Sequence, residues 1–596
     1  MSDKHYFPST SANSLVPRAL RALVSANGHL SLNYTERVIS NAFHDDSKVS
    51  IISGGGSGHE PAWSGYVGDG LLSAVACGDI FASPSAKQIL AAIRTTPSKK
   101  GTILLITNYT GDRLHFGLAA ERAKAEGLVE KIAILHATDD VSIGRSKNSH
   151  MGRRGLPGHV FTMKIIGAAA SEGYSFEQCL ALGQAVNGQT VTIASALDHC
   201  HVPGRHQQSS VPDNVVVVGA GIHNEPGQLH VSPAPPVEKL IEQCLKFLCD
   251  ESDTERGFVK FEPRDEIGLL VNNYGGLSVL ELSALTDEIQ CQLSSRWNIR
   301  PCKTLFGTFE TSLNAPGFSI SLCNLTAAAR QSNESVATLV RHFDCATTAV
   351  SWPNTTRPSP SQQKTTFDNL DAKANSQIIA SPRIKFDPLL LEKAIRTSCE
   401  RAIAAEPRLT QWDMVMGDGD CGEAVQGLAE SVLQSVDKGC TTSGDLLEVI
   451  RSVLQNVDDM GGTLGAIFGV LLSALYTAMR KNSLEGEISP NTPNFYSTAL
   501  ASATTTLKSH TGAREGDRTV MDVLLPFSEE FSKTNDFLSA VDVAARKAEE
   551  TRHLKANFGR ATYVGDASSQ QLPDPGAWAF YEIVAGLADG LGLWPN

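Results

Sequence analysis

The sequence lacks paired cysteines, long basic runs and an apolar signal segment at its start. Its 12 cysteines include no CxxC pair and no regular spacing, which disfavours a disulfide framework and favours a reducing, cytoplasmic location. Its 51 Lys and Arg residues are outnumbered by 64 Asp and Glu residues, and with a net charge of −13 no nucleic-acid partner is expected. The composition is ordinary for a soluble globular enzyme.

The sequence also lacks an apolar run long enough to span a membrane. Its longest apolar stretch, residues 465–479, falls short of the ~18–20 residues that a bilayer requires, and Ser473, Tyr476 and Thr477 interrupt it. We therefore expect a buried helix there and no membrane partner.

A chain of 596 residues is too long for one hydrophobic core, so two or more domains are expected. Over about residues 20–350, short β-branched runs alternate with helical patterns, which is typical of an α/β domain. Six of these runs are "VSIISGGG", "GTILLITN", "KIAILHA", "TVTIASA", "NVVVVGAG" and "EIGLLVNN". Glycines cluster where the runs end, and the ligands of α/β sheets bind at such strand ends.

The composition changes near residue 350. The next segment is rich in Pro, Ser, Thr, Asn and Gln, and we assign residues 351–384 to an interdomain linker. Asp387 and Pro388 then form an N-cap and N1 pair, and helical periodicity follows without a convincing strand. The predicted organisation is an α/β domain at 1–350 and an all-α domain at 385–596.

A glycine-rich segment, residues 53–70, follows the first of these runs. Its backbone amides could approach an anionic or hydroxylated ligand closely, although a tight structural turn has the same composition. The spacing matches neither GxxxxGK[ST] nor GxGxxG, so a nucleotide loop is not established. His59 in this segment is expected to face whatever binds there.

Two further residues carry candidate chemistry. Asp112 lies at a predicted strand-to-helix junction, where a carboxylate can cap the helix or act as a general base. His223 follows four valines within "GAGIHNEPG", where glycines leave its ring accessible and Glu225 lies two residues on. A core histidine, a metal ligand, a general base and a covalent nucleophile all fit this pattern. Since two further metal ligands cannot be assigned, we favour nucleophilic or acid/base chemistry.

Six motifs occur in the order found in one family: "ISGGGSGHEP", "NYTGDRLHFGLAAERA", "GRRGLPG", "LDHCHVPG", "GAGIHNEPG" and "FETSLNAPGFSISL". Nearly all of residues 1–350 resembles the substrate-binding domain of dihydroxyacetone kinases, which has two α/β subdomains. The resemblance implies that His223 adds to the ketone carbon of dihydroxyacetone to form a hemiaminal, while His59 and Asp112 bind its hydroxyls and assist proton transfer. The substrate-binding residues that it implies are Gly56, Ser57, Gly58, His59, Thr107 and Asp112.

Three carboxylates mark the second domain. Asp413, Asp418 and Asp420 form a D-x4-D-x-D array in "WDMVMGDGDCG", which we place in a loop between helices. Such close carboxylates repel one another unless cations neutralise them, and their hard oxygen atoms suit Mg²⁺. An acidic surface turn is the alternative, but the interspersed glycines favour a shaped loop.

Other motifs of this domain point to phosphate. "MGGTLGAIFG" puts a Gly-Gly-Thr turn at a predicted helix N-terminus, where backbone amides favour an anion. In "TGAREGDRTVMDVL", Arg514 and Arg518 could neutralise phosphate charge or form surface salt bridges. "GRATYVG" and "PDPGAWA" complete the set.

These elements, over roughly residues 385–596, resemble the nucleotide-binding domain of the same kinases, an all-helical barrel that holds ATP through two Mg²⁺ ions. The metal ligands that the resemblance implies are Asp413, Asp418 and Asp420. The nucleotide-binding residues that it implies are Asp418, Gly419, Asp420, Cys421, Gly462, Thr463, Leu464, Gly512, Arg518, Val520, Met521, Asp574, Pro575 and Gly576.

Four positions depart from the family pattern. Thr107 stands where a substrate-contacting lysine is usual, and Val217 where a glutamate commonly precedes the histidine. Leu464 replaces a serine of the glycine turn, and Glu310 replaces a methionine. A lost charged donor costs about 1.5–3 kcal/mol, which would weaken turnover without abolishing a covalent mechanism.

We therefore expect a cytoplasmic, homodimeric kinase that uses ATP and Mg²⁺ to phosphorylate dihydroxyacetone or a related small carbonyl compound. One alternative is a diverged enzyme that keeps His223 for isomerisation, cyclisation or condensation, and a related variant is the cyclising cleavage of FAD. A binding protein with an inactive kinase domain is the third, and the three aspartates count against it.

Overall fold

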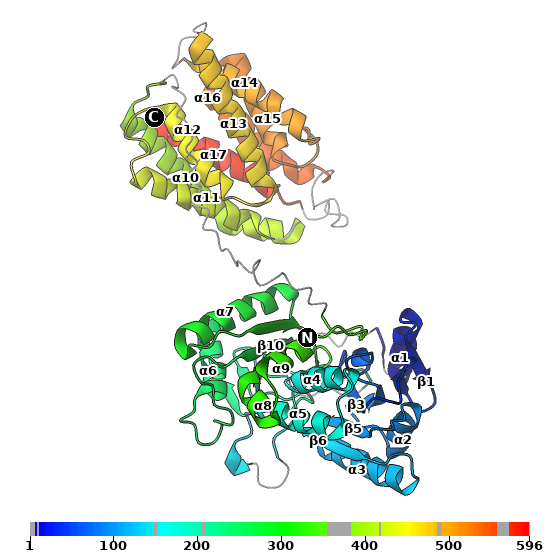
Figure 1. Ribbon diagram of the computed structural model, residues 1–596. Helices are drawn as coiled ribbons and strands as arrows, with labels where there is room; N and C mark the ends of the chain where they lie inside the picture. The colour runs from blue at the N-terminus through cyan, green and yellow to red at the C-terminus, as the bar shows by residue number, and fades with distance from the viewer. Residues whose placement is uncertain are drawn as a thin grey trace. The chain divides into compact units, whose positions relative to one another are not determined.

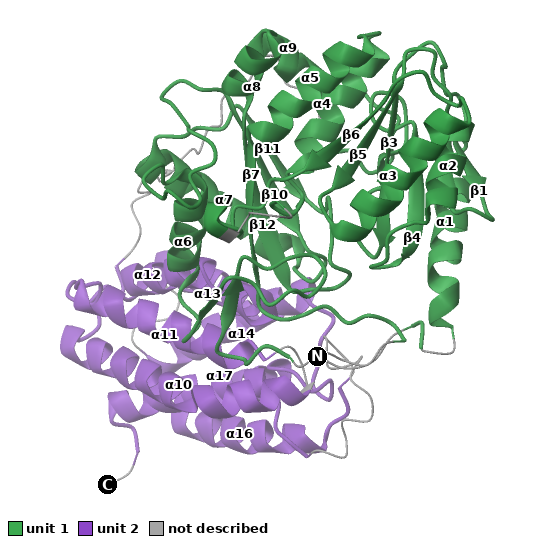
Figure 2. Cartoon of the chain, turned by 90° about the horizontal axis from the view of Figure 1, so that it is seen from below, with its two compact units in different colours: residues 1–365 green, residues 366–596 purple. Residues whose placement is uncertain are grey.

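The computed structural model describes the chain except for residues 1–5, 9–10, 148–151, 205–209, 354–382, 417–418, 486–491, 557–570 and 595–596. It divides into two compact units, Met1–Thr365 and Thr366–Asn596 (Figure 2). The expected linker at 351–384 lies almost entirely outside the described residues.

Unit 1 contains a first six-stranded mixed sheet in the order β1-β2-β4-β3-β5-β6. Strands β4, β3, β5 and β6 are parallel, whereas β2 is antiparallel to β4 and β1 is antiparallel to β2. The strand bounds are Leu30–Asn33 (β1), Val38–Asn41 (β2), Ser50–Ser57 (β3), Ala74–Ile80 (β4), Thr102–Thr107 (β5) and Ile132–Ala137 (β6). Because β3 and β5 are parallel neighbours, their carboxyl ends meet at one edge of the sheet.

The second sheet of unit 1 has the order β11-β10-β12-β7-β8-β9, and only β10 and β11 are parallel. Its strands are Thr190–Ala196 (β7), Val216–Val218 (β8), Leu229–Val231 (β9), Ile267–Asn273 (β10), Lys303–Gly307 (β11) and Gly317–Asn324 (β12). All six apolar runs quoted from the sequence are strands, namely β3, β5, β6, β7, β8 and β10. The two sheets confirm the predicted pair of α/β subdomains.

Helices cover both faces of each sheet (Figure 1). The middle layer between the sheets consists of α4, α5, α8 and α9, while α2 and α3 cover the outer face of the first sheet and α6 and α7 that of the second. The helices are Leu15–Ala26 (α1), Ala86–Thr95 (α2), Thr110–Ala125 (α3), His159–Ser171 (α4), Phe176–Gly188 (α5), Val237–Cys249 (α6), Val279–Trp297 (α7), Leu325–Ser332 (α8) and Val336–Asp344 (α9). Strands covered on both faces explain why β3 and β5 are buried along their whole length.

The described residues of unit 2 form eight α-helices and no strand beyond an isolated bridge between Lys385 and Asp445. Each helix packs against the next along the chain, and α17 returns to pack against α10, so the ring is closed. The helices are Pro388–Met416 (α10), Cys421–Asp437 (α11), Leu446–Asp458 (α12), Gly462–Glu485 (α13), Pro493–His510 (α14), Met521–Thr534 (α15), Phe537–Glu550 (α16) and Pro575–Leu591 (α17). This arrangement is the expected helical barrel.

The predicted start of α10 is confirmed. Oδ1 of Asp387 accepts the backbone N–H of Leu390 at 2.8 Å, and Pro388 is the first helical residue. The helix then runs further than expected, because apolar residues continue its pattern to Met416. The prediction of a loop around Asp413 was therefore wrong: this aspartate lies in the last turn of α10.

The apolar stretch at 465–479 lies within α13, as predicted. It is less buried than predicted: only 28% of the most apolar 18-residue window of this helix is buried within the described structure. Among the described helices, α13 is long and apolar enough to cross a membrane, but length and composition alone are weak evidence for such a span.

Candidate active site

Three predicted residues from the two sheets of unit 1 converge. His59 follows β3, and Asp112 lies in the first turn of α3, directly after β5. His223 comes from the second sheet, five residues beyond the end of β8. The ring of His59 contacts the ring of His223, and His223 lies close enough to Asp112 for its charge to act on that carboxyl group. The three residues therefore form one site.

The two histidines face each other through their ring nitrogens. Nε2 of His59 lies 3.1 Å from Nε2 of His223, and the rings are perpendicular. Nδ1 of His59 lies 2.8 Å from the carbonyl oxygen of Thr311. Because a carbonyl can only accept, His59 carries its proton on Nδ1 and offers a lone pair at Nε2. Burial and the neighbouring charge of His223 lower the pKa of His59 to about 3, so its ring is neutral near pH 7.

Aromatic rings surround the histidine pair. The ring of Phe81 stacks on His59 with centroids 4.9 Å apart and meets the ring of His223 edge-on at 5.2 Å. Tyr109 meets His223 edge-on at 4.6 Å. These rings pack against the histidine pair, and an apolar surrounding strengthens the electrostatic interactions made there.

Asp112 is a buried carboxyl group in the first turn of α3. Burial raises its pKa to about 6, although a hydrogen bond from Ser83 and the charge of His223 act in the opposite direction. Its Oδ1 atom has no hydrogen-bond partner among the described residues. The N-cap of α3 is Tyr109, so Asp112 is not the capping residue. A buried, partly unsatisfied carboxylate that ionises near pH 6 is suited to general-base chemistry.

The glycine-rich segment around His59 is tightly packed. The hydroxyl of Ser57 donates to the carbonyl of Gly78 at 2.9 Å, and the backbone N–H of Gly58 donates to Glu60 at 2.8 Å. A Cβ atom at Gly56 would lie 2.7 Å from the backbone of the residue that follows Phe81. These contacts hold His59 and Phe81 in place. The hydroxyl of Ser57 and the backbone N–H of Gly58 therefore already have hydrogen-bond partners within the protein.

Thr107 ends β5 and is buried. Gly155 of "GRRGLPG" packs directly on it, since a Cβ atom there would lie 2.8 Å from the Cα atom of Thr107. Val217 is also buried, in β8, and lines a small cavity of about 20 Å³ together with Glu225. Thr107 and Val217, two of the four departures from the family pattern, are thus buried residues packed beside the candidate site.

Unit 2 brings together several predicted nucleotide residues from distant segments. Asp574 caps α17 by accepting the N–H of Ala577 at 2.7 Å. Burial raises the pKa of Asp574 to about 7, and the charges of Asp522 and Asp413 add to this effect while Arg518 opposes it. Acid groups from α10, α15 and the start of α17 therefore lie close enough to act on one another.

Two of the three expected metal ligands, Asp413 and Asp420, lie at the same place. Oδ2 of Asp413 accepts the backbone N–H groups of Gly419 and Cys421, each at 3.1 Å, and Asp420 is the N-cap residue of α11. Burial, then the charges of Asp574, Asp413 and Asp420, raise the pKa of Cys421 to about 12. Asp418 lies outside the described residues. Without it the described residues contain no cluster of three metal-ligating groups, but the hard oxygen atoms of Asp413 and Asp420 fit Mg²⁺.

The other nucleotide candidates lie at helix starts nearby. A Cβ atom at Gly576 would lie 3.6 Å from Leu464 and 3.9 Å from Val520, which brings α17, α13 and the start of α15 together. Arg518 donates to the carbonyl of Leu572 at 2.7 Å. The remaining candidates are Gly462 and Thr463 at the start of α13, Met521 at the start of α15, Pro575 at the start of α17 and Gly512, an exposed residue just after the end of α14. Arg514, exposed, donates to three backbone carbonyls.

Comparison with known proteins decides the family. The Dak1 domain model matches residues 21–345, and the DAK2 domain model matches residues 415–589. A dihydroxyacetone kinase of Pichia angusta is 39% identical over 99% of this chain and 98% of its own length. Dihydroxyacetone kinase 1 of Saccharomyces cerevisiae is 37% identical over 99% and 100%. The chain belongs to the dihydroxyacetone kinase family.

A solved structure of this family supports the same assignment. The dihydroxyacetone kinase from C. freundii in complex with AMP-PNP and Mg²⁺ aligns with a TM-score of 0.62 at 26% identity, covering 99% of this chain and 100% of that chain. The alignment therefore covers both the α/β unit and the helical unit of this chain.

Sequence reasoning missed several residues that surround the histidine pair in this structure. Tyr109 and Arg154 lie inside quoted motifs, so their spacing was available as a signal. Thr311 also lies inside a quoted motif, "FETSLNAPGFSISL", whereas Phe81 stacks on His59 from outside every quoted motif.

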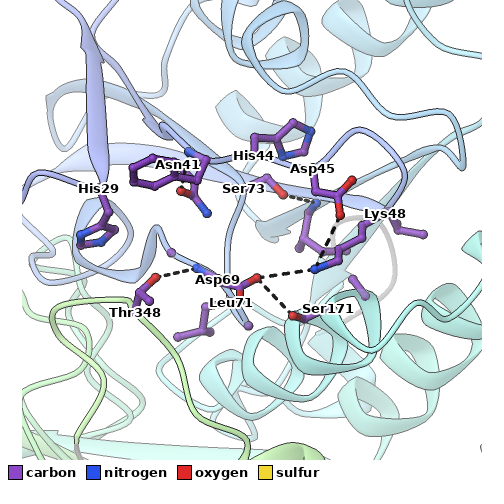
Figure 3. A pocket seen from close by; sticks show the side chains of 17 residues that line it. His29, Asn41, His44, Asp45, Lys48, Asp69, Leu71, Ser73, Ser171 and Thr348 are labelled. Carbon is purple, nitrogen blue, oxygen red and sulfur yellow. Dashed lines mark hydrogen bonds and ion pairs between the residues drawn. The ribbon is translucent and has the colours of Figure 1, made fainter.

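A polar cavity of about 390 Å³ opens elsewhere in unit 1 (Figure 3). Asp69 accepts a hydrogen bond from Ser171 at 3.1 Å there, and its carboxylate lies 4.0 Å from Nζ of Lys48. None of the site residues expected from the sequence lines this cavity. The histidine pair therefore remains the candidate active site of this family member.

Proposed function

We propose that this protein transfers the γ-phosphoryl group of ATP to a terminal hydroxyl of dihydroxyacetone, with His223 as the residue that captures the ketone. The observation that carries this proposal is the 3.1 Å contact between Nε2 of His59 and Nε2 of His223 beside the buried carboxyl of Asp112. A nucleophilic nitrogen, a proton acceptor and a general base thus lie in one water-poor site. The names of the full-length relatives favour the same substrate.

Capture fixes the substrate before phosphoryl transfer. Nε2 of His223 forms a bond to the ketone carbon, and the carbonyl oxygen takes a proton, which gives a hemiaminal. His59 can relay this proton because its Nε2 holds a lone pair and faces His223. A ligand without a carbonyl, such as glycerol, cannot form this bond and is expected to be rejected.

Transfer then requires a terminal oxygen that is both positioned and deprotonated. We assign Asp112 as the base that takes the hydroxyl proton as the oxygen attacks the γ-phosphorus and the bond to ADP breaks. The bond between His223 and the substrate carbon afterwards breaks, and the phosphorylated ketone leaves. A covalent anchor makes the encounter effectively intramolecular on the acceptor side.

Unit 2 is proposed to supply the nucleotide site. Asp413, Asp418 and Asp420 would hold Mg²⁺, which when bound neutralises phosphate charge. The turns that begin α13 and α17 offer backbone N–H groups to phosphate oxygens. We further propose a homodimer in the cytoplasm, in line with the composition and the resemblance.

The decisive experiment incubates the purified full-length protein with Mg-ATP and dihydroxyacetone and follows ADP and the phosphorylated product. His223→Ala should lower turnover by about 10³-fold or more, whereas His115→Ala, an exposed residue of α3, should have no effect. Absence of ADP formation with every short ketose and aldose would overturn the kinase proposal. Full turnover of a carbonyl substrate by Asp418→Ala but not by His223→Ala would favour the non-phosphorylating alternative.

A further inference from the structure

Glu225 contacts His223 at two points. Its Oε2 atom accepts the backbone N–H of His223 at 2.7 Å, and its Oε1 atom lies 3.6 Å from Nδ1 of the same histidine. The second distance is longer than a hydrogen bond, and such contacts in ligand-free active sites commonly shorten when substrate binds. The carboxylate therefore faces the ring nitrogen opposite to the one that meets His59.

The motif is built to leave room for this carboxylate. A Cβ atom at Gly221 would overlap both Glu225 and Arg154. Asn224 adopts a left-handed backbone conformation with a φ of 61°. Its side chain accepts the backbone N–H of Cys200 and donates to the carbonyl of the same residue. This turn points Glu225 back toward the ring of His223. The glycine and the asparagine of "GAGIHNEPG" thus serve the glutamate as well as the histidine.

The charge of Glu225 is held in place from the other side. Arg154 lies 3.4 Å from Oε1 of Glu225 and also forms an ion pair with the fully buried Asp140 at 2.7 Å. Burial alone would raise the pKa of Glu225, but His223 and Arg154 outweigh it and lower the pKa to about 2. Glu225 is therefore a carboxylate at any pH at which the enzyme would work.

The protons of the two histidines follow from these contacts. A lone pair on Nδ1 of His223 would face the carboxylate of Glu225, which is unfavourable, so Nδ1 carries a proton. Nε2 of His59 holds a lone pair, so the contact between the two Nε2 atoms is favourable only when Nε2 of His223 also carries a proton. The resting His223 is then a cation balanced by Glu225.

We infer that Glu225 is a positioning residue for substrate capture: it keeps a proton on Nδ1 of His223, so that Nε2 is the reacting nitrogen, and it neutralises the charge of the adduct. This inference rests on the proposed role of His223 as the covalent anchor. The role of Glu225 follows from its contacts with His223; its spacing in the motif or its burial alone would not indicate it.

The step balances without any further reactant. The Nε2 proton of His223 passes to the carbonyl oxygen through Nε2 of His59, while the lone pair left on Nε2 forms the bond to the ketone carbon. The product is a hemiaminal on a ring that still carries the Nδ1 proton and a single positive charge. Because the charge is the same before and after capture, the ion pair with Glu225 persists through the step.

The charged and titratable groups around the histidine pair come from several elements. They are Glu225 on the same loop, Arg154 and Asp140 on the segments before α4, Tyr109 and Asp112 at the start of α3, and His59 after β3. Of these, Glu225 is the group whose carboxylate is within 4 Å of Nδ1 of His223.

The test uses the full-length protein and dihydroxyacetone labelled with ¹³C at the ketone carbon, without ATP, so that capture is measured apart from phosphoryl transfer. The adduct appears as a tetrahedral-carbon resonance in place of the carbonyl resonance. Glu225→Gln should reduce the adduct, and kcat in a separate assay with Mg-ATP, by about 100-fold or more, since an amide can donate to Nδ1 and stabilise the wrong tautomer. Glu255→Gln, an acceptor of the N–H of Ser146 far along the chain, is the matched control and should behave as wild type.

Two additional measurements separate positioning from a structural effect. Gly221→Ala keeps the carboxylate but displaces it, and it should also reduce the adduct. In ¹⁵N-histidine spectra, the signals that disappear in His223→Ala should show a protonated Nδ1 in wild type and an unprotonated Nδ1 in Glu225→Gln. The melting temperature of Glu225→Gln should match that of wild type, which excludes unfolding as the cause, because an unfolded histidine also favours a neutral ring with an unprotonated Nδ1.

The outcomes distinguish this inference from the proposed function. Wild-type adduct and an unchanged tautomer in Glu225→Gln, with the adduct lost in His223→Ala, would overturn the role of Glu225 and leave His223 as the anchor. An adduct that persists in His223→Ala would overturn the proposed capture itself.

Discussion

The carboxyl group of Glu310 lies 3.7 Å from Nδ1 of His159, and both side chains are fully buried. Nδ1 of His159 donates to the carbonyl of Leu156 at 3.0 Å, and its Nε2 accepts the indole N–H of Trp63 at 3.0 Å. A histidine that is satisfied in this way is neutral and cannot balance a carboxylate. Burial raises the pKa of Glu310 well above its ordinary value, so the group is a neutral acid in the core.

Glu310→Met should stabilise unit 1. Neither carboxyl oxygen of Glu310 has a hydrogen-bond partner among the described residues, and an unsatisfied buried polar group costs about 1–3 kcal/mol. Methionine has a similar volume and no polar hydrogen to satisfy. We expect urea denaturation near pH 7 to show a higher free energy of unfolding for the variant, by about that amount.

The same variant makes a prediction about pH. An acid whose pKa is raised in the folded state stabilises the protein fully below its unfolded pKa of 4.5, and this contribution falls as pH rises toward the folded pKa. The advantage of Glu310→Met should therefore grow by up to about 1.4 kcal/mol per pH unit above pH 4.5. Glu130→Met, at an exposed site, is the control. A pH-independent difference would show that Glu310 is ionised in the fold.

Activity should rise with pH as Asp112 ionises. The pKa of this carboxyl is raised to about 6, so the base is protonated below that value and available above it. We expect kcat/KM for dihydroxyacetone to increase about tenfold per pH unit below pH 6 and to level off above it. The measurement is a pH profile at saturating Mg-ATP.

Asp112→Asn provides the contrast for this profile. The amide cannot take the hydroxyl proton, so turnover should fall by about 10²–10⁴-fold and the limb near pH 6 should disappear. The ¹³C-labelled adduct should still form, because capture depends on His223. A limb that remains in Asp112→Asn would have to be assigned to another group.

The strands of unit 1 could be predicted because their burial is continuous. The run "TILLIT" is buried at all six positions, and a strand covered on both faces reads as an unbroken apolar stretch. The helix α15 could not be predicted in the same way, since Pro526 lies inside it and breaks the usual pattern. Asp413 was misplaced because the predicted loop began too early: α10 continues to Met416, directly before the first glycine of the motif.

The candidate site was predictable only in part. Its histidines and Asp112 stand in motifs at strand ends. The ends of the parallel neighbours β3 and β5 bring His59 and Asp112 together, whereas His223 comes from the second sheet. The carbonyl of Thr311 holds His59 from 252 positions away, through the pairing of a second sheet. Such long-range approaches are set by sheet order: Thr311 stands in a quoted motif, but nothing in that motif shows which histidine its carbonyl orients.

Asp413→Asn should weaken the binding of Mg-AMP-PNP without disrupting the loop before α11. An asparagine keeps one oxygen that can accept the N–H groups of Gly419 and Cys421, but it loses the charge that a divalent cation requires. We expect at least about tenfold weaker binding by calorimetry, from a loss of about 1.4 kcal/mol or more. Asp437→Asn, which removes a surface ion pair with Arg396, is the matched control.

Chelation distinguishes the metal from the loop in this experiment. With EDTA present, wild type and Asp413→Asn should bind the nucleotide equally weakly, because neither then holds a cation. A variant that still binds more weakly than wild type without metal would show that Asp413 acts through the loop.

Gly155→Ala should damage the substrate site through packing alone. A Cβ atom at position 155 would lie 2.8–2.9 Å from the Cα, Cβ and Cγ2 atoms of Thr107, and the buried end of β5 cannot move aside. Overpacking of this kind costs about 1–3 kcal/mol. The shift also reaches Arg154, the neighbour that holds Glu225, so capture of labelled dihydroxyacetone should fall together with the melting temperature.

Gly117→Ala is the matched control: position 117 lies within α3 with no atom within 4 Å of the added carbon, and alanine there should stabilise the helix by about 0.5–1 kcal/mol. Equal stability of the two variants would mean that the contact between Gly155 and Thr107 is looser than 2.8 Å, and that the lysine usual at position 107 could be accommodated here.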